Sequence, residues 1–167
     1  MKSGKLLNRL LILALVLLNV GCDQVTKSIV RKHVDYNDNI KVISDHITLT
    51  KVENSGAFLS SGDSLPGPVK FAFLSLLPLL VLGYGLYFLM IKSNLNTLLI
   101  VGISFVIGGG IGNLYDRISF GSVTDFLHID FVWFQTGVFN AADLSIMSGM
   151  LMILISQYMT SRRSQIA

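Results

Sequence analysis

The chain has 167 residues, of which 51% are hydrophobic and 14% charged, and its mean hydropathy is +0.63. A soluble domain of this size needs more polar surface to cover its core, so the composition argues against one. The net charge of +3 does not indicate nucleic-acid binding, because all ten acidic residues fall between Asp23 and Asp143 while both ends of the chain are basic.

Four apolar stretches are long enough to cross a bilayer as helices, since about 20 residues at ~1.5 Å each span its hydrocarbon core. They cover about residues 6–22, 71–91, 95–114 and 141–160. Pro78 lies inside the second stretch, where neighbouring helices can satisfy the freed backbone groups. A short turn over residues 92–94 joins the second and third stretches, which predicts an antiparallel hairpin.

The distribution of basic residues predicts the orientation. Six of them lie in segments without any acid, namely Lys2, Lys5, Arg9, Lys92, Arg162 and Arg163. By the positive-inside rule we expect both termini in the cytoplasm. The loops over residues 24–70 and 115–140 then face outward, although the first also contains lysines and arginines interleaved with acids.

The first outward loop contains a pattern typical of strands. Residues 40–43 and 47–52 alternate apolar and polar side chains and are rich in β-branched residues, which predicts a small strand pair on the membrane surface. Residues 60–68 are rich in Ser, Gly and Pro and indicate a loop. The chain has no internal repeat, so we expect a single domain over residues 1–167. The expected fold is an all-α polytopic membrane protein with four transmembrane helices and a small extracytoplasmic β-sheet.

Three carboxylates are expected at one depth of this bundle. Asp116 follows the third span, Asp143 lies in the first turn of the fourth, and Asp23 ends the first. Ionisable groups at the edge of the hydrocarbon are costly, which makes them candidates for a functional site. Two close carboxylates in a poorly solvated site share a proton, so one can activate a water while the other polarises a carbonyl. We therefore expect Asp116 and Asp143 to form an aspartic-protease pair.

Five short motifs resemble those of bacterial lipoprotein signal peptidases and occur in that family's order. They are Asp23-Gln24-Val25-Thr26-Lys27, Asn54-Ser55-Gly56-Ala57-Phe58, Gly108-Gly109-Gly110-Ile111-Gly112-Asn113-Leu114-Tyr115-Asp116-Arg117, Val123-Thr124-Asp125-Phe126 and Phe139-Asn140-Ala141-Ala142-Asp143. Each motif alone is weakly or moderately specific, but all five on a four-span chain of this length make a strong match.

The resemblance implies an intramembrane aspartyl endopeptidase of the bacterial inner membrane. Such enzymes cleave prolipoproteins on the N-terminal side of a diacylglyceryl-modified cysteine, and their extracytoplasmic sheet cradles the substrate. It implies Asp116 and Asp143 as the catalytic pair, with base and acid not assigned between them. Supporting residues are implied at Asp23, Lys27, Asn54, Gly56, Asn113, Arg117, Asp125 and Asn140. We expect a monomer among membrane lipids, without cofactor, metal or nucleic acid.

Several of these residues also have purely structural interpretations. Asp143 could stabilise the N-terminus of a helix capped by Asn140. Asp23 and Lys27 have the spacing of a simple helix-surface ion pair. Arg117 does not face its neighbour Asp116 on a helix and is expected to be held by another group, such as Asp125.

Three further features are expected to be structural. Asn54 and Gly56 could form only a turn, although an Asn beside a strand could also bind an extended substrate. Gly108 and Gly112 have the spacing of closely packed membrane helices, and no lysine follows them to suggest a phosphate loop. Trp133 is expected in an interfacial aromatic belt.

Two other functions remain open from sequence. Cys22 follows a basic segment and a Leu-rich stretch, as in a lipoprotein signal peptide, so the chain could be a lipoprotein anchored there. Against this, Asn19 stands where such signals prefer Leu. A proton- or ion-coupled transporter could use the same carboxylates as a relay. It predicts carboxylates spread across the membrane depth, whereas the acidic residues here are all expected toward one side.

Overall fold

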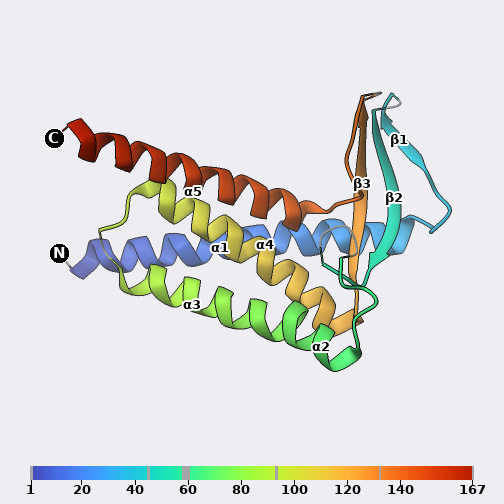
Figure 1. Cartoon of the computed structure of the whole chain (residues 1–167), viewed down its shortest axis with the longest axis horizontal. Coiled ribbons are helices and arrows are strands. Elements are labelled where there is room, and N and C mark those ends of the chain that lie inside the picture. Colours follow the sequence, from blue (N-terminus) through green and yellow to red (C-terminus); the bar gives the residue numbers. More distant parts are fainter. Residues whose placement is uncertain (1, 45, 58–60, 93, 132, 167) are drawn as a thin grey trace.

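The computed structural model describes residues 2–44, 46–57, 61–92, 94–131 and 133–166. Its long helical segments lie side by side, with a sheet across one end of the bundle (Figure 1). These segments are α1 (Lys2–His33), α2 (Gly67–Phe71) continued by the π-helical turn η2 (Ala72–Leu76) and by α3 (Leu77–Ile91), then α4 (Thr97–Phe120) and α5 (Ala141–Ile166). Both termini and the α3–α4 connection lie at one end, the terminal end, and the sheet lies at the other, the sheet end (Figure 1).

The prediction of four membrane-spanning helices is confirmed, since four helices in the described part of the chain are long and apolar enough to cross a membrane. The first and third are longer than predicted. α1 continues past Cys22 to His33 because its charged residues Asp23 and Lys27 are buried against neighbouring elements rather than exposed. α4 continues to Phe120 and ends at Gly121, whose φ of 81° gives the left-handed conformation typical of a helix C-cap.

The second spanning helix begins earlier than expected. Helical structure starts at Gly67, with Pro68 in the first turn, where the missing N–H of proline is tolerated. Pro78 lies in the first turn of α3, directly after the π-helical turn η2, and such turns accommodate interruptions of the regular bonding pattern. The expected loop over residues 60–68 is therefore shorter; its first residue Ser60 and the motif residue Phe58 lie outside the described residues.

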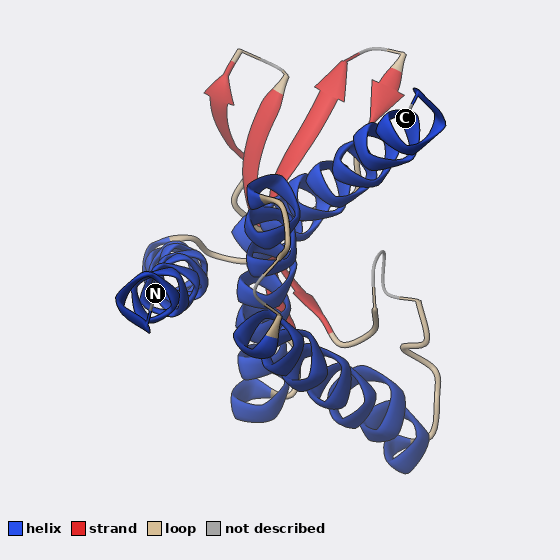
Figure 2. Ribbon diagram, turned by 90° about the vertical axis from the view of Figure 1, so that its left-hand side faces the viewer, coloured by secondary structure: helices blue, strands red, loops and turns tan. Residues whose placement is uncertain are grey.

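α4 is the central helix of the bundle and contacts each of the other three, as the end-on view shows (Figure 2). Its glycines permit this packing. An added Cβ at Gly108 would lie 2.5 Å from Cβ of Asn19 on α1, and one at Gly102 would lie 2.8 Å from the carbonyl oxygen of Gly149 on α5. The expectation that Gly108 mediates close helix packing is thus confirmed, and Gly102 and Gly149 extend such packing to α5.

The sheet consists of β1 (Ile40–Ile43), β2 (Ile47–Asn54), β3 (Val123–Phe131) and β4 (Phe134–Gln135), antiparallel and in that order. The predicted strand pair is confirmed. β3 and β4 lie in the segment 115–140, which was expected to be a loop. In β2 and β3, Asn54 pairs with Val123, and Val52 pairs with Asp125. Because β3 begins close after the end of α4, this register places Asn54 at the end of β2 within hydrogen-bond distance of Asp125.

The contact between Gly102 and Gly149 predicts a specific effect on stability. In Gly149→Ala, the new Cβ would lie 2.5 Å from the carbonyl oxygen of Gly102 and 2.9 Å from the backbone nitrogen of Val106, so α4 and α5 must separate. We expect the free energy of unfolding to fall by about 1–3 kcal/mol, measured by denaturant unfolding in detergent. The control Gly83→Ala has open space around it and should be neutral or slightly stabilising; equal effects of the two variants would contradict the packing argument.

Candidate active site

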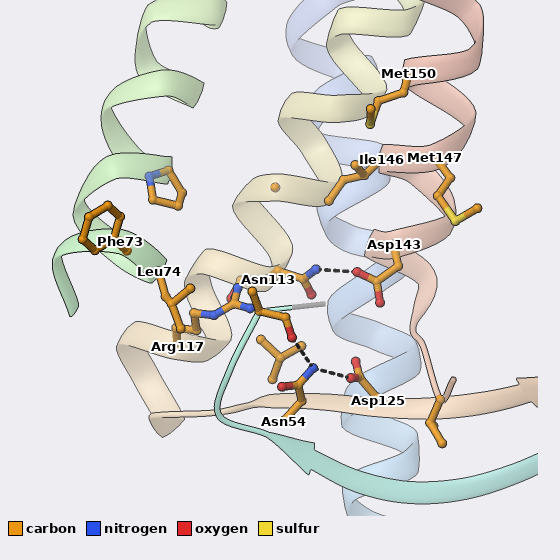
Figure 3. A pocket seen from close by; sticks show the side chains of 15 residues that line it. Asn54, Phe73, Leu74, Asn113, Arg117, Asp125, Asp143, Ile146, Met147 and Met150 are labelled. Atoms are coloured by element: carbon orange, nitrogen blue, oxygen red, sulfur yellow. Dashed lines mark hydrogen bonds between the residues drawn. The ribbon is translucent and has the colours of Figure 1, made fainter. Parts of the chain in front are cut away.

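A cavity of about 480 Å³ opens at the sheet end between the helices. Its polar residues lie toward the sheet and its apolar residues lie farther along the helices (Figure 3). The polar set is Asn54, Asn113, Arg117, Asp125 and Asp143, and the apolar set includes Phe73, Leu74, Pro78, Ile146, Met147 and Met150. The polar end of the cavity can therefore hold a reacting group, and its apolar walls can contact the apolar part of the same molecule.

Two carboxylates line this cavity, Asp125 from β3 and Asp143 from the first turn of α5 (Figure 3). Asp125 is 4% exposed, and it accepts hydrogen bonds from the amide of Asn54 at 3.1 Å and from that of Asn140 at 2.6 Å. Asp143 is half-buried and accepts one from the amide of Asn113 at 2.9 Å. Both carboxylates are held by neutral donors, so neither is neutralised by a cation through these bonds.

Asn140 connects the two carboxylates. Its side-chain oxygen accepts the backbone N–H of Asp143 at 3.0 Å, while its own backbone N–H donates to the Asp143 carboxylate at 3.1 Å. This reciprocal pattern is a helix capping box, and it confirms the capping role expected for Asn140. Its amide also donates to Asp125 and, at 3.1 Å, to the side-chain oxygen of Asn113. One buried residue therefore caps α5 and links the floor of the cavity.

Asp116, expected to pair with Asp143, lies behind the cavity rather than in its lining. It is fully buried, with its carboxylate 2.9 Å from the ammonium of Lys27 and 2.9 Å from the guanidinium of Arg31. The physical reason is the length of α1, whose final turns bring these two cations to the end of α4. The carboxylate that shares the cavity with Asp143 is Asp125.

The residues Asp23, Lys27, Arg31 and Asp116 form a buried ion cluster. Lys27 is fully buried and binds the carboxylate of Asp23 at 2.8 Å, as well as Asp116. The surface-pair interpretation of Asp23 and Lys27 is therefore excluded. Arg31 and Gln24 were not among the predicted site residues; the amide of Gln24 donates to the carboxylates of Asp23 and Asp116 at 3.1 Å each. Arg31 lies four residues after Lys27, a spacing that would have revealed it once the helix was extended.

The buried ion cluster is connected to the cavity by two hydrogen bonds. Lys27 donates to the side-chain oxygen of Asn113 at 2.8 Å, which turns the amide nitrogen of Asn113 toward Asp143. Asp23 accepts the backbone N–H of Ala142 at 2.9 Å, in the first turn of α5. The cluster thus orients Asn113, a hydrogen-bond donor to Asp143, and fixes the turn of α5 that contains Asp143.

Arg117 and Gly56 meet at the edge of the cavity. The guanidinium of Arg117 donates to the carbonyl oxygen of Gly56 at 2.9 Å and to that of Asn113 at 3.4 Å. Its Nε atom is buried without a hydrogen-bond partner. Among the described residues no carboxylate forms an ion pair with Arg117, so the expected contact with Asp125 is not made directly. Asn54 shapes the turn, because its side-chain oxygen accepts the N–H of Gly56 at 3.0 Å.

Burial raises the pKa of Asp125 to about 6, from an ordinary value of 3.8. Desolvation is the main cause, and the negative charge of Asp143 acts in the same direction. The hydrogen bonds from Asn54 and Asn140 oppose the shift by favouring the ionised form. Asp125 therefore keeps its proton to a higher pH than an ordinary carboxyl group does.

Other expected features lie away from the cavity. Trp133 is 90% exposed beyond the end of β3, and Cys22 is an exposed free thiol on α1. Within the described ranges, no group of three or more His, Cys, Asp and Glu side chains is arranged to hold a metal ion. The buried carboxylates Asp23, Asp116 and Asp125 all lie toward the sheet end, and the chain has none near the terminal end to form a relay across the membrane.

Comparison with known proteins identifies one family for most of the chain. A family model described as signal peptidase (SPase) II matches residues 15–159. The lipoprotein signal peptidase of Staphylococcus carnosus is 32% identical over 86% of this chain and 87% of its own length. That of Streptococcus pyogenes serotype M1 is 33% identical over 88% of this chain and 91% of its own length.

Two solved structures share the fold. Both are described as bacterial membrane enzymes determined by the in meso method, one at 2.3 Å and one at 1.9 Å resolution. The first superposes with a TM-score of 0.79 at 28% identity, covering 90% of this chain and 88% of its own. The second gives 0.78 at 29% identity, covering 87% and 91%.

The buried ion cluster predicts a large loss of stability in Lys27→Met. The variant keeps the side-chain volume but leaves the carboxylate of Asp23 without its ammonium and that of Asp116 with Arg31 as its remaining cation. We expect the free energy of unfolding to fall by about 3–5 kcal/mol, measured by unfolding in detergent. Lys32→Met changes an exposed lysine on the same helix and is the control; a loss under 1 kcal/mol in Lys27→Met would show that the cluster is not needed.

Proposed function

Because the chain belongs to the signal peptidase II family, we propose that it is an aspartyl endopeptidase that removes signal peptides from bacterial prolipoproteins. The observation that carries the aspartyl mechanism is the joint presence of Asp125 and Asp143 in one cavity. We assign the catalytic pair to these two residues rather than to Asp116 and Asp143. The lysine and arginine beside Asp116 neutralise it and occupy its oxygens, whereas Asp125 and Asp143 receive neutral amides.

The proposed reaction follows from a pair that shares one proton. We assign the proton to Asp125, whose pKa is raised, and the role of base to Asp143. A water between them gives a proton to Asp143 as its oxygen attacks the scissile carbonyl carbon, and Asp125 protonates the carbonyl oxygen. Collapse of the tetrahedral intermediate returns that proton to Asp125 and transfers the proton on Asp143 to the departing amine. Pair and products are then restored without a covalent intermediate.

The polar neighbours have distinct proposed roles. Arg117 lines the cavity, and its positive charge suits it to hold a carbonyl oxygen of the substrate backbone. Asn54 ends β2 beside the cavity and Gly56 follows in the turn, where an extended segment could pair with the main chain. Asn113 and Asn140 keep the two carboxylates in place.

The apolar walls suit a substrate attached to the membrane. They follow the start of the second spanning helix and one face of α5, through Phe73, Ile146 and Met150 (Figure 3). We propose that the diacylglyceryl chains of the modified cysteine lie along these walls, with cleavage on the N-terminal side of that cysteine. The acid-free terminal end then faces the cytoplasm and the site lies near the outer face of the bacterial inner membrane.

The catalytic assignment predicts a separation between three aspartate variants. Asp125→Asn and Asp143→Asn should lower kcat at least about 10²–10⁴-fold while the protein remains folded. Asp116→Asn should mainly lower the free energy of unfolding. Its turnover per folded molecule should exceed that of the other two variants by at least tenfold. The measurement is conversion of a diacylglyceryl-modified prolipoprotein by purified protein, alongside unfolding in the same detergent.

Asp63→Asn is the matched control, because Asp63 is paired with Lys70 outside the cavity. It should keep wild-type turnover. Full activity in Asp125→Asn, or a loss in well-folded Asp116→Asn as deep as that of Asp143→Asn, would overturn the assignment. If the wild-type protein itself does not cleave the diacylglyceryl-modified prolipoprotein, the proposed lipoprotein signal peptidase activity is contradicted, whichever aspartates are catalytic.

The raised pKa of Asp125 predicts a pH dependence with a definite sign. Above a pH of about 6 the shared proton is lost, so kcat/KM should fall as pH rises. The same shift means that the folded protein binds this proton more tightly than the unfolded chain, so Asp125's contribution makes unfolding easier as pH rises from about 4 to 6. Asn54→Leu removes a hydrogen bond that lowers the pKa and should move the decline in kcat/KM to higher pH.

The pH–rate profile of wild type and variants on one substrate measures this effect. Asn39→Leu, a change at an exposed position outside the cavity, should leave the decline where it is in the wild type. A shift of the Asn54→Leu profile to lower pH would contradict the proposed role of Asp125 as the group that carries the proton.

A further inference from the structure

A second charged site lies at the terminal end of the bundle, far from the cavity with the two aspartates. A small pocket of about 70 Å³ is lined there by Lys5 and Arg9 of α1 and by Lys92, which follows α3. Arg9 is held in place by a hydrogen bond from its Nε to the carbonyl oxygen of Met90 at 3.0 Å. This bond uses one of the five N–H groups of the guanidinium and leaves the other four available to a ligand.

These three cations have no acidic counterpart at that end of the molecule. The chain contains no Asp or Glu before Asp23, between Asp63 and Asp116, or after Asp143. The terminal halves of all four helices are therefore free of negative charge. Three positive charges around one pocket repel one another unless an anion lies among them.

An apolar groove adjoins the basic pocket. It has a volume of about 270 Å³ and lies between Leu11 and Leu15 of α1 and Val101 of α4. Asn8, Ile12 and Ile100 line both the pocket and the groove, so the two lie next to each other and share one wall. The groove runs along helices that span the membrane, which makes it accessible to an acyl chain rather than to a soluble molecule.

We propose that the basic pocket and its groove together bind an anionic glycerophospholipid at the terminal end of the bundle. Lys5, Arg9 and Lys92 contact the phosphate of the headgroup, and one acyl chain lies in the groove against Leu11, Leu15 and Val101. Basic pockets between membrane helices hold anionic headgroups by this combination of charge and apolar contact. The lipid would fasten the start of α1 to the end of α3, two elements that Arg9 already joins.

The test uses purified full-length protein in a neutral detergent. Its unfolding temperature is measured against added phosphatidylglycerol, phosphatidylcholine or glycerol 3-phosphate, because a ligand of the folded state raises that temperature. We expect phosphatidylglycerol to stabilise the protein in a saturable manner. The same response to phosphatidylcholine would show that charge is not recognised, and the same response to glycerol 3-phosphate would show a phosphate site without an acyl groove; either result overturns the proposal.

The triple variant Lys5→Gln, Arg9→Gln, Lys92→Gln should bind phosphatidylglycerol on the order of 100-fold more weakly. The matched control removes the same charge elsewhere, in Lys32→Gln, Lys51→Gln, Arg162→Gln, and should bind it as the wild type does. If the first triple variant does not fold, Lys5→Gln, Lys92→Gln keeps the contact of Arg9 with Met90 and should still bind at least about tenfold more weakly. Wild-type affinity in the folded pocket variant would overturn the proposal.

Discussion

The ammonium of Lys27 is the point on which the sheet end of this protein depends. It is fully buried, and it binds Asp23 within its own helix, Asp116 on α4 and the amide oxygen of Asn113. A buried charge is tolerated only when its ionic and hydrogen-bonding partners are all in place, so α1 and α4 can adopt only one relative position here. Asp23 then extends the constraint to α5 through the N–H of Ala142. Because burying these charges costs desolvation energy, the main effect of the cluster is to fix the relative positions of α1, α4 and α5.

This cluster also explains how far the site could be predicted from the sequence. Span number, strand pair and the common depth of Asp23, Asp116 and Asp143 followed from hydropathy and topology. The expected pairing of Asp116 with Asp143 came from this common depth and from the resemblance of the motifs, while the first span was expected to end near Cys22. Extended to His33, the helix brings Lys27 and Arg31 to Asp116. Hydropathy cannot show that a charged turn is buried by partners distant in the sequence.

The strand β3 was the other missing element. Residues 123–126 are almost entirely buried, so they lack the alternation of apolar and polar side chains that reveals a half-exposed strand. Asp125 stands in this buried run between Thr124 and Phe126. A carboxylate in such a setting must be matched by donors from elsewhere, and these come from Asn54 and Asn140. Because this segment was predicted to be a loop, its pattern did not indicate that Asp125 shares a cavity with Asp143.

Asn140 shows why the two aspartates keep a defined relation despite coming from a strand and a helix. As the N-cap it fixes Asp143 in the first turn of α5, and the same amide donates to Asp125. The dipole of α5 favours negative charge at Asp143, while burial in the sheet favours the proton on Asp125. A helix N-terminus and a buried strand therefore place the two carboxylates in different electrostatic environments. The proposed aspartyl mechanism needs a pair that shares one proton, and two carboxylates in such unlike environments suit that role.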